Sequence, residues 1–127
     1  MIVRYEGGMK FSAESRGHKV TTDLPGDLGG TDSAMMPPEL LAASLGTCIG
    51  VYVAGYLKKV DIPPDGLTVE VDYDKTQDPV RIGRISAKVT IPDGVPEERR
   101  AAVRKVAEQC MIHNTLCNLP EVELVLS

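Results

Sequence analysis

Apolar and polar residues alternate along two stretches in the middle of the chain. The alternation runs from Leu67 to Asp74 and recurs from Ile82 to Ile91. A period of two is typical of strands that bury one face and expose the other. Asp78 and Pro79 lie between the two stretches, so the pattern predicts a hairpin of two long strands.

Shorter strands are predicted near the N-terminus. The expected stretches are Ile2–Glu6, Met9–Glu14 and His18–Asp23. Gly7 and Gly8 separate the first two and suit a tight turn. The segment from residue 24 to residue 37 is punctuated by Gly, Pro and Asp, which indicates a loop.

A long helix is predicted next. Pro37 and Pro38 suit its first turn, where an N–H has no helical partner, and Glu39 complements the positive end of the helix dipole. Lys58 and Lys59 suit the other end, and the prolines that follow forbid continuation. We therefore expect the helix to span residues 37–59.

A second helix is expected from Pro96, and the tail Val122–Leu126 is expected to form a closing strand. One stripe of that helix would carry Val103, Val106, Ala107 and Cys110. Strands and helices that follow one another without regular alternation indicate an α+β fold. The length of 127 residues suits a single domain over residues 1–127.

The central helix has no polar face. Residues 40–57 contain no charged side chain, yet they fall slightly short of the roughly 20 predominantly apolar residues of a membrane span. Gly46, Gly50 and Gly55 dilute the segment further and would let another backbone approach closely. We interpret it as a buried helix and predict a symmetric homodimer with this helix near the interface. A helix sandwiched within one chain is the alternative.

The charge and cysteine content narrow the possible partners. The net charge is -4 and no basic stripe is interleaved with aromatic residues, so we expect no nucleic-acid partner. Residues 1–6 lack the features of a signal peptide, and three widely spaced cysteines do not form a disulfide framework. A reducing, cytoplasmic location is expected.

Cys48 and Cys110 are the candidate nucleophiles. Each falls on an apolar stripe, where a free cysteine can equally act as a small buried hydrophobe. Burial raises the pKa of a thiol, whereas the thiolate is the nucleophile, so a catalytic Cys48 needs a nearby cation. The candidate cations are Arg4, Arg16, His18 and His113.

Three segments resemble the motifs of the OsmC/Ohr family, the osmotically inducible and organic hydroperoxide resistance proteins. Gly29-Gly30-Thr31-Asp32 followed by residues 37–48 is similar to the family's central-helix signature. Residues 110–116, with the sequence CMIHNTL, are similar to its second cysteine motif, and Arg16-Gly17 resembles its early arginine segment. The resemblance covers essentially the whole chain and implies an OsmC-like fold in an intertwined dimer.

The resemblance also implies a thiol-dependent peroxidase that acts in oxidative stress defence. Cys48 would attack the hydroperoxide, Cys110 would resolve the sulfenic acid to a disulfide, and an external dithiol would reduce that disulfide. Arg16, from the partner chain, would hold the thiolate and orient the peroxide. No cofactor is implied. Apolar residues flank both thiols, which favours organic hydroperoxides as substrates.

Two departures from the family pattern keep alternatives open. Pro38 stands where peroxidases of the family place a glutamate, and Glu39, a candidate catalytic residue one position later, would fall roughly opposite Cys48 on a helix. A non-catalytic dimer that binds a small apolar ligand is therefore the alternative function. Cys117 is an extra thiol, and with Cys48, Cys110 and His113 it could complete a zinc site; we favour a spare thiol and expect no metal.

Overall fold

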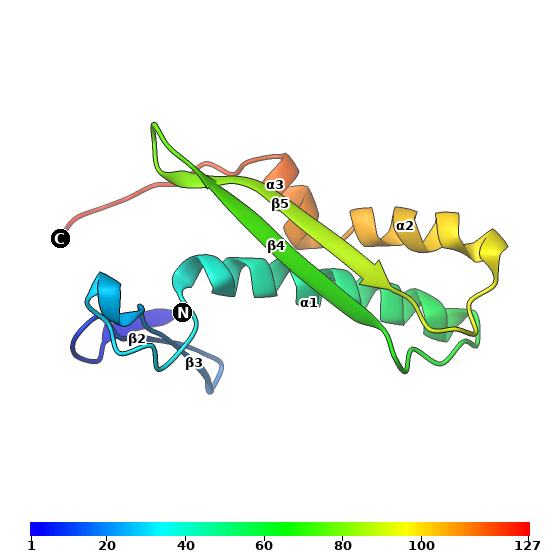
Figure 1. Cartoon of the computed structure of the whole chain (residues 1–127), viewed down its shortest axis with the longest axis horizontal. Coiled ribbons are helices and arrows are strands. Elements are labelled where there is room, and N and C mark those ends of the chain that lie inside the picture. The colour runs from blue at the N-terminus through cyan, green and yellow to red at the C-terminus, as the bar shows by residue number, and fades with distance from the viewer. The chain divides into compact units, whose positions relative to one another are not determined.

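The computed structural model describes residues 1–127 and has a mixed α+β architecture (Figure 1). The order of elements is three strands, a long helix, a hairpin and two further helices, which confirms the predicted α+β class. Contacts within the chain define two compact units, residues 1–43 and residues 44–127. The long helix begins in the first unit and continues in the second.

The first unit contains a three-stranded antiparallel sheet in the order β1-β2-β3. Its strands are β1 (Ile2–Tyr5), β2 (Phe11–Ser15) and β3 (His18–Thr22), close to the predicted stretches. Gly7 and Gly8 both have positive φ in the first turn, as its tightness requires. Arg16 and Gly17 form the second turn, also with positive φ at both positions, which matches the twist of a two-residue hairpin.

Asp23 organises the loop that follows β3. Its side chain is 1% exposed and accepts five hydrogen bonds. Two come from the hydroxyl groups of Thr31 and Ser33, at 2.7 and 2.8 Å, and three come from the backbone N–H groups of Leu24, Thr31 and Ser33. One buried carboxylate thus closes the loop over ten residues.

Gly30 is required where this loop closes. A Cβ at that position would lie 1.8 Å from the carbonyl oxygen of Leu24 and 2.8 Å from Oδ1 of Asp23. A side chain at residue 30 would therefore push the loop off Asp23. The Gly29-Gly30-Thr31-Asp32 motif is explained here as loop architecture, since Gly30 allows the close approach and Thr31 supplies two of the donors.

Helix α1 (Pro37–Lys59) has the predicted bounds. Its first turn is capped by Glu39, whose Oε2 accepts the backbone N–H of Met36 at 2.7 Å. This is one half of a capping box, in which the third helical residue reaches back to the residue before the helix. Glu39 therefore satisfies a backbone donor as well as complementing the helix dipole.

The second unit contains the antiparallel hairpin of β4 (Thr68–Thr76) and β5 (Arg81–Thr90), which confirms the predicted pair of long strands. The hairpin packs across α1 (Figure 1). Gly46 lies at this contact, where an added Cβ would stand 2.9 Å from Cγ2 of Val71. Gly46 thus lets α1 approach its own hairpin, whereas we expected it to admit another backbone. Gly55 is exposed.

The segment predicted as one helix from Pro96 is divided into shorter pieces. A 3₁₀ turn (Glu97–Arg99) leads into α2 (Arg100–Glu108), and a separate helix α3 spans Met111–Cys117. Cys110 lies between the helices in extended conformation, so the expectation that it continues the stripe of Val103 is wrong. The chain turns at this point because the Cys110 side chain caps α3.

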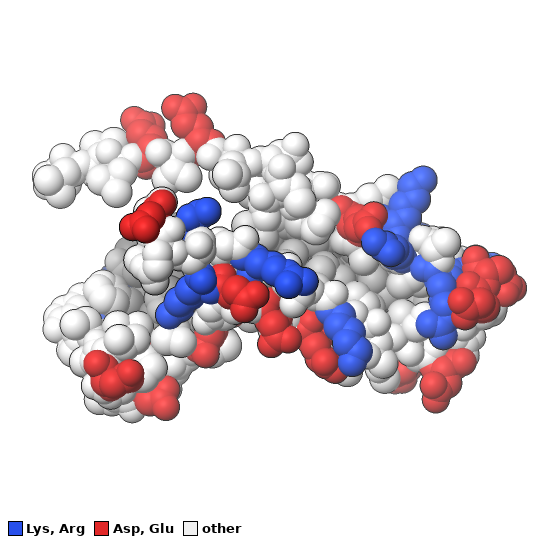
Figure 2. All heavy atoms as spheres, turned by 45° about the horizontal axis from the view of Figure 1, so that its top comes forward, with Lys and Arg blue, Asp and Glu red and all other residues white.

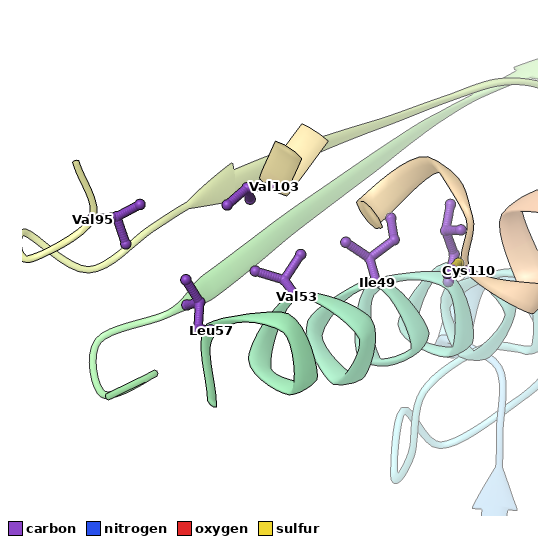
Figure 3. Close-up of a cluster of buried hydrophobic side chains, with 7 residues drawn as sticks. Ile49, Val53, Leu57, Val95, Val103 and Cys110 are labelled. Carbon is purple, nitrogen blue, oxygen red and sulfur yellow. The ribbon is translucent and has the colours of Figure 1, made fainter. Parts of the chain in front are cut away.

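The core of the second unit is aliphatic. Figure 3 shows Ile49, Val53 and Leu57 projecting from one side of α1 toward the elements that cover it. Val103 of α2 and Val95 complete this cluster, with Cys110 at its far end. Buried positions along α1 recur every three or four residues, so the chain covers one stripe of the helix.

The opposite stripe of α1 remains uncovered. Val51 is 69% exposed and Tyr52 is 39% exposed, although neither is charged. By length and composition alone α1 could cross a membrane, but its buried stripe packs on the chain's own hairpin as a core helix does. The alternative, a helix sandwiched within one chain, is therefore not met, because the chain leaves this stripe exposed.

The tail from residue 119 to the end is not a strand. Its apolar side chains, Leu119, Val122, Leu124, Val125 and Leu126, are all exposed. In Figure 1 the tail runs on from α3 as an irregular segment (red). The predicted closing strand is therefore wrong for the single chain, because no neighbouring strand pairs with it and an isolated strand has no ladder to satisfy its backbone.

The hydrogen bonds to the Asp23 carboxylate predict how the stability of the fold depends on pH. Hydrogen bonds from Thr31 and Ser33 hold the pKa of Asp23 well below its ordinary value of 3.8. A lowered native pKa stabilises the fold above the unfolded pKa, and this contribution is lost as the pH falls below it. We expect the free energy of unfolding to fall between about pH 5 and pH 2, and to fall much less in Asp23→Asn. Urea titrations would measure both.

Asp27→Asn is the matched control, because Asp27 is an exposed acid in the same loop. It should retain the pH dependence of the original chain. The role assigned to Asp23 would be contradicted if Asp23→Asn kept the stability of the original chain at neutral pH and the same fall in the free energy of unfolding at acidic pH.

Candidate active site

Cys48 lies midway along α1 at the edge of the buried stripe. Leu45 and Ile49 on either side of it are buried, whereas Cys48 is partly exposed and packs against their cluster. Cys48 therefore contacts the core and keeps part of its surface exposed. Thr47, the residue before it, is exposed.

Cys110 occupies a different environment. Its side chain is fully buried, and it is the N-cap residue of α3. Its Sγ accepts the backbone N–H of His113 at 3.2 Å, where a serine or aspartate oxygen would usually serve. The thiol is thus fixed in orientation by the start of the helix that follows it.

The structure brings these two thiols together. Burial raises the pKa of Cys110 above its ordinary value of 9.0, against the lowering effect of the His113 N–H, and the neighbouring Cys48 thiol raises it further. Cys110 therefore carries its proton at neutral pH. One partly exposed thiol stands beside one buried, protonated thiol.

His113 and Cys117 lie on α3 beside this pair. The His113 Nε2 is 3.7 Å from the Sγ of Cys117, which is exposed. No three His, Cys, Asp or Glu side chains of the chain converge as a metal site requires. The zinc hypothesis has no geometric support, because Cys110 is turned to cap α3 and does not continue a common helix face with His113 and Cys117.

Arg16 and Glu39 belong to the first unit, whereas both thiols belong to the second. Arg16 is exposed at the tip of the β2–β3 turn, and no side chain or backbone group of the chain pairs with it. Arg4, another candidate cation, pairs with Glu14 at 3.8 Å. The carboxylate of Glu39 is engaged by the Met36 N–H.

The role of the His113 backbone was missed from the sequence. We considered the His113 ring as a candidate cation, but it is the main-chain N–H that contacts the Cys110 sulfur. The signal that could have revealed it is the N-cap arrangement, in which the residue just before a helix accepts a hydrogen bond from the backbone N–H three positions later. The apolar stripe of the preceding segment instead predicts a helix that continues through Cys110.

Acidic and basic side chains are mixed on the surface of the molecule. Figure 2 shows acidic and basic side chains interspersed, without a continuous basic patch. Three cations of the second unit pair with acids, among them Lys88 with Glu70 at 3.6 Å and Arg104 with Glu108 at 3.1 Å. Such pairs are solvated and contribute little to stability.

The family is decided by comparison with known proteins. The model of the OsmC-like protein family matches residues 30–125. The chain belongs to the OsmC family. That match includes α1, the hairpin and both cysteines, and so covers the whole of the second unit except its last two residues. No curated protein sequence matches the chain.

Solved structures of the OsmC family share this fold. An osmotic stress induced and detoxification response protein from Psychrobacter arcticus 273-4 superposes with a TM-score of 0.83 at 25% identity, covering 90% of this chain and 85% of that one. An organic hydroperoxide resistance protein OsmC from Legionella pneumophila gives 0.68 at 21% identity, with coverages of 91% and 87%.

An organic hydroperoxide resistance protein from Vibrio cholerae, with captopril bound in one of its active sites, gives a TM-score of 0.57 at 18% identity. The coverages are 90% of this chain and 81% of that one. These likenesses support the OsmC-like architecture.

The environment of Cys110 predicts its reactivity. Iodoacetamide reacts with thiolates, so at about pH 7 we expect the buried, protonated Cys110 to be alkylated at least about tenfold more slowly than Cys117. Its rate should rise with pH and level off only above pH 9.0, because its pKa is raised above that value. Mass spectrometry of peptides from timed reactions would follow each cysteine.

The same reaction in denaturing urea is the control, since all three thiols should then react alike. If Cys110 of the folded protein were alkylated as rapidly as Cys117 at neutral pH, its assignment as a buried neutral thiol would be incorrect.

Proposed function

We propose that this OsmC family member is a thiol-dependent peroxidase that reduces organic hydroperoxides with Cys48 and Cys110. The observation that carries the proposal is the pair of adjacent thiols in unlike environments. Cys48 is partly exposed and can meet a substrate, while Cys110 is buried, fixed by the His113 N–H and protonated. Neighbours named as hydroperoxide resistance proteins support this class of chemistry.

Cys48 acts as the peroxidatic residue. Its thiolate attacks the terminal oxygen of the hydroperoxide, an S–O bond forms and the O–O bond breaks. The departing alkoxide takes a proton and leaves as the alcohol, and Cys48 becomes a sulfenic acid. Peroxide is reduced by two electrons that come from the sulfur.

Cys110 resolves the intermediate. Its sulfur attacks the sulfenic sulfur of Cys48, the hydroxyl group leaves with the Cys110 proton as water, and a disulfide forms. An external dithiol then reduces this disulfide by exchange and restores both thiols. The raised pKa of Cys110 suits this order, because a protonated Cys110 leaves Cys48 as the first to react.

The proposed enzyme works as an intertwined homodimer. The uncovered stripe of α1, with Val51 and Tyr52, and the exposed apolar tail are surfaces that a second chain would cover. In this arrangement the free guanidinium of Arg16 comes from the partner chain, holds the Cys48 thiolate and orients the peroxide. It would supply the cation that a catalytic Cys48 needs.

Glu39 has no part in the proposed chemistry, because its carboxylate caps α1. The apolar residues beside Cys48, including buried Leu45 and Ile49, favour an organic substrate over hydrogen peroxide. A cytoplasmic location fits three free cysteines, which a reducing compartment preserves.

The peroxidatic and resolving roles predict distinct outcomes for two variants. Cys48→Ser should lose consumption of cumene hydroperoxide by at least about a thousandfold, since no other residue supplies the nucleophile. Cys110→Ser should react once and stop at a sulfenic acid, because no resolving thiol remains. Peroxide assays with a dithiol reductant, together with mass spectrometry, would distinguish these states.

Cys117→Ser is the matched control, as it removes an exposed thiol and leaves the proposed pair intact. It should retain full turnover and form a Cys48–Cys110 disulfide at one equivalent of peroxide. Full peroxide consumption by Cys48→Ser, or three free thiols at excess peroxide in the original chain, would end the peroxidase proposal.

A site shared between chains predicts complementation. Arg16→Gln and Cys48→Ser homodimers should each be inactive, the first because its thiolate lacks the cation. In a mixed dimer one site contains both native residues, so random reassortment should restore about a quarter of the original activity. Peroxide consumption would be measured after mild unfolding and refolding of an equal mixture.

The same proteins mixed without subunit exchange are the control and should remain inactive. If peroxide consumption did not recover once subunit exchange had been verified, Arg16 would not act across the interface.

A further inference from the structure

The second unit contains a cavity whose charged lining residues have no role in the proposed chemistry. Its volume is about 460 Å³, and it lies between α1, β5 and α2. Neither Cys48 nor Cys110 lines it. The volume falls within the roughly 300–1,000 Å³ of sites that bind small molecules.

The floor of the cavity is apolar. Leu45 and Ile49 of α1 face it from one side, and Val89 of β5 and Val103 of α2 line it as well. These side chains also belong to the core or pack against it, so core packing holds the floor of the cavity in place. A hydrocarbon chain would bury apolar surface here, which favours its binding.

Two cations of α2 line the same cavity. Arg100 and Arg104 stand one turn apart on the helix face that carries Val103. Their side chains are 55% and 84% exposed, and their acidic neighbours Glu97 and Glu108 are 84% and 55% exposed, so these ion pairs are solvated and can exchange partners. Two guanidinium groups against one lining carboxylate favour an anion.

His113 adds a hydrogen-bonding group without a partner. It lines the cavity, and its Nδ1 is buried with no hydrogen bond in the chain. Buried polar atoms are almost always paired, and an exception calls for an explanation. A bound molecule with a polar group would provide the missing partner.

We infer that this cavity binds a medium-chain carboxylate, with the hydrocarbon chain on the aliphatic floor and the carboxylate at Arg100 and Arg104. The site lies beside the thiol pair, since Leu45 and Ile49 flank Cys48 and the His113 N–H caps Cys110. It stands independently of the peroxidase proposal, because neither sulfur lines the cavity and binding consumes no peroxide.

Calorimetric titration of the full chain with decanoate tests the site. Decanoate should bind with one equivalent per chain, while decanol should bind at least about fivefold more weakly and decyltrimethylammonium should not bind, because only the carboxylate pairs with the arginines. Cys48→Ser should bind decanoate as the original chain does. Decanoate binding by this variant and its loss of peroxidase activity are therefore separate measurements.

Two variants locate the site. Arg100→Gln with Arg104→Gln should weaken decanoate binding about tenfold and leave decanol unchanged. The control pair Arg84→Gln with Lys88→Gln removes the same charge from β5 outside the cavity and should have no effect. Ala107→Leu, which adds volume to the lining, should reduce the binding of both ligands.

Equal affinity for decanoate and decyltrimethylammonium would overturn the anionic assignment. No binding by the folded original chain, or equal loss in the two charge-removing pairs, would overturn the site itself. Since the arginines are exposed, their substitution should leave the melting temperature unchanged, and this would be verified for each variant.

Discussion

The uncharged helix α1 is the constraint on which the rest of the structure depends. From Leu40 to Leu57 it offers no charged side chain to water, so its surface has to be covered by apolar groups. The β4–β5 hairpin covers one stripe, and Gly46 allows the close approach at Val71. The other stripe, with Val51 and Tyr52, stays open in a single chain, and so the proposal of a dimer follows from the same requirement.

The position of Cys48 follows from this packing. A residue at the centre of the buried stripe would be inaccessible, and one on the open stripe would be detached from the core. Cys48 lies at the boundary, where it contacts the core and is partly exposed. Cys110 reaches it from the far side of the cluster because the chain breaks its helix after Glu108 and starts α3 with the Cys110 thiol as cap.

In the first unit, one buried side chain likewise holds a loop in place. The fully paired carboxylate of Asp23 closes the loop that leads into α1, and Gly30 permits that closure. Some residues of the family-like motifs therefore have a structural role in the loop or at the helix start. Thr31 and Gly30 belong to the loop, Glu39 belongs to the helix start, and the cysteines carry the proposed chemistry.

The sequence by itself determined the elements whose signals are local. Proline and lysine positions predicted the bounds of α1, and the period of two predicted β4 and β5, because these depend on neighbours within a few residues. The resemblance of the cysteine motifs also indicated the OsmC family. Only the tertiary structure decided that Cys48 stands beside Cys110, and that the tail at Val122–Leu126 lacks a pairing strand in one chain. These depend on contacts between residues far apart in the chain, which no local pattern encodes.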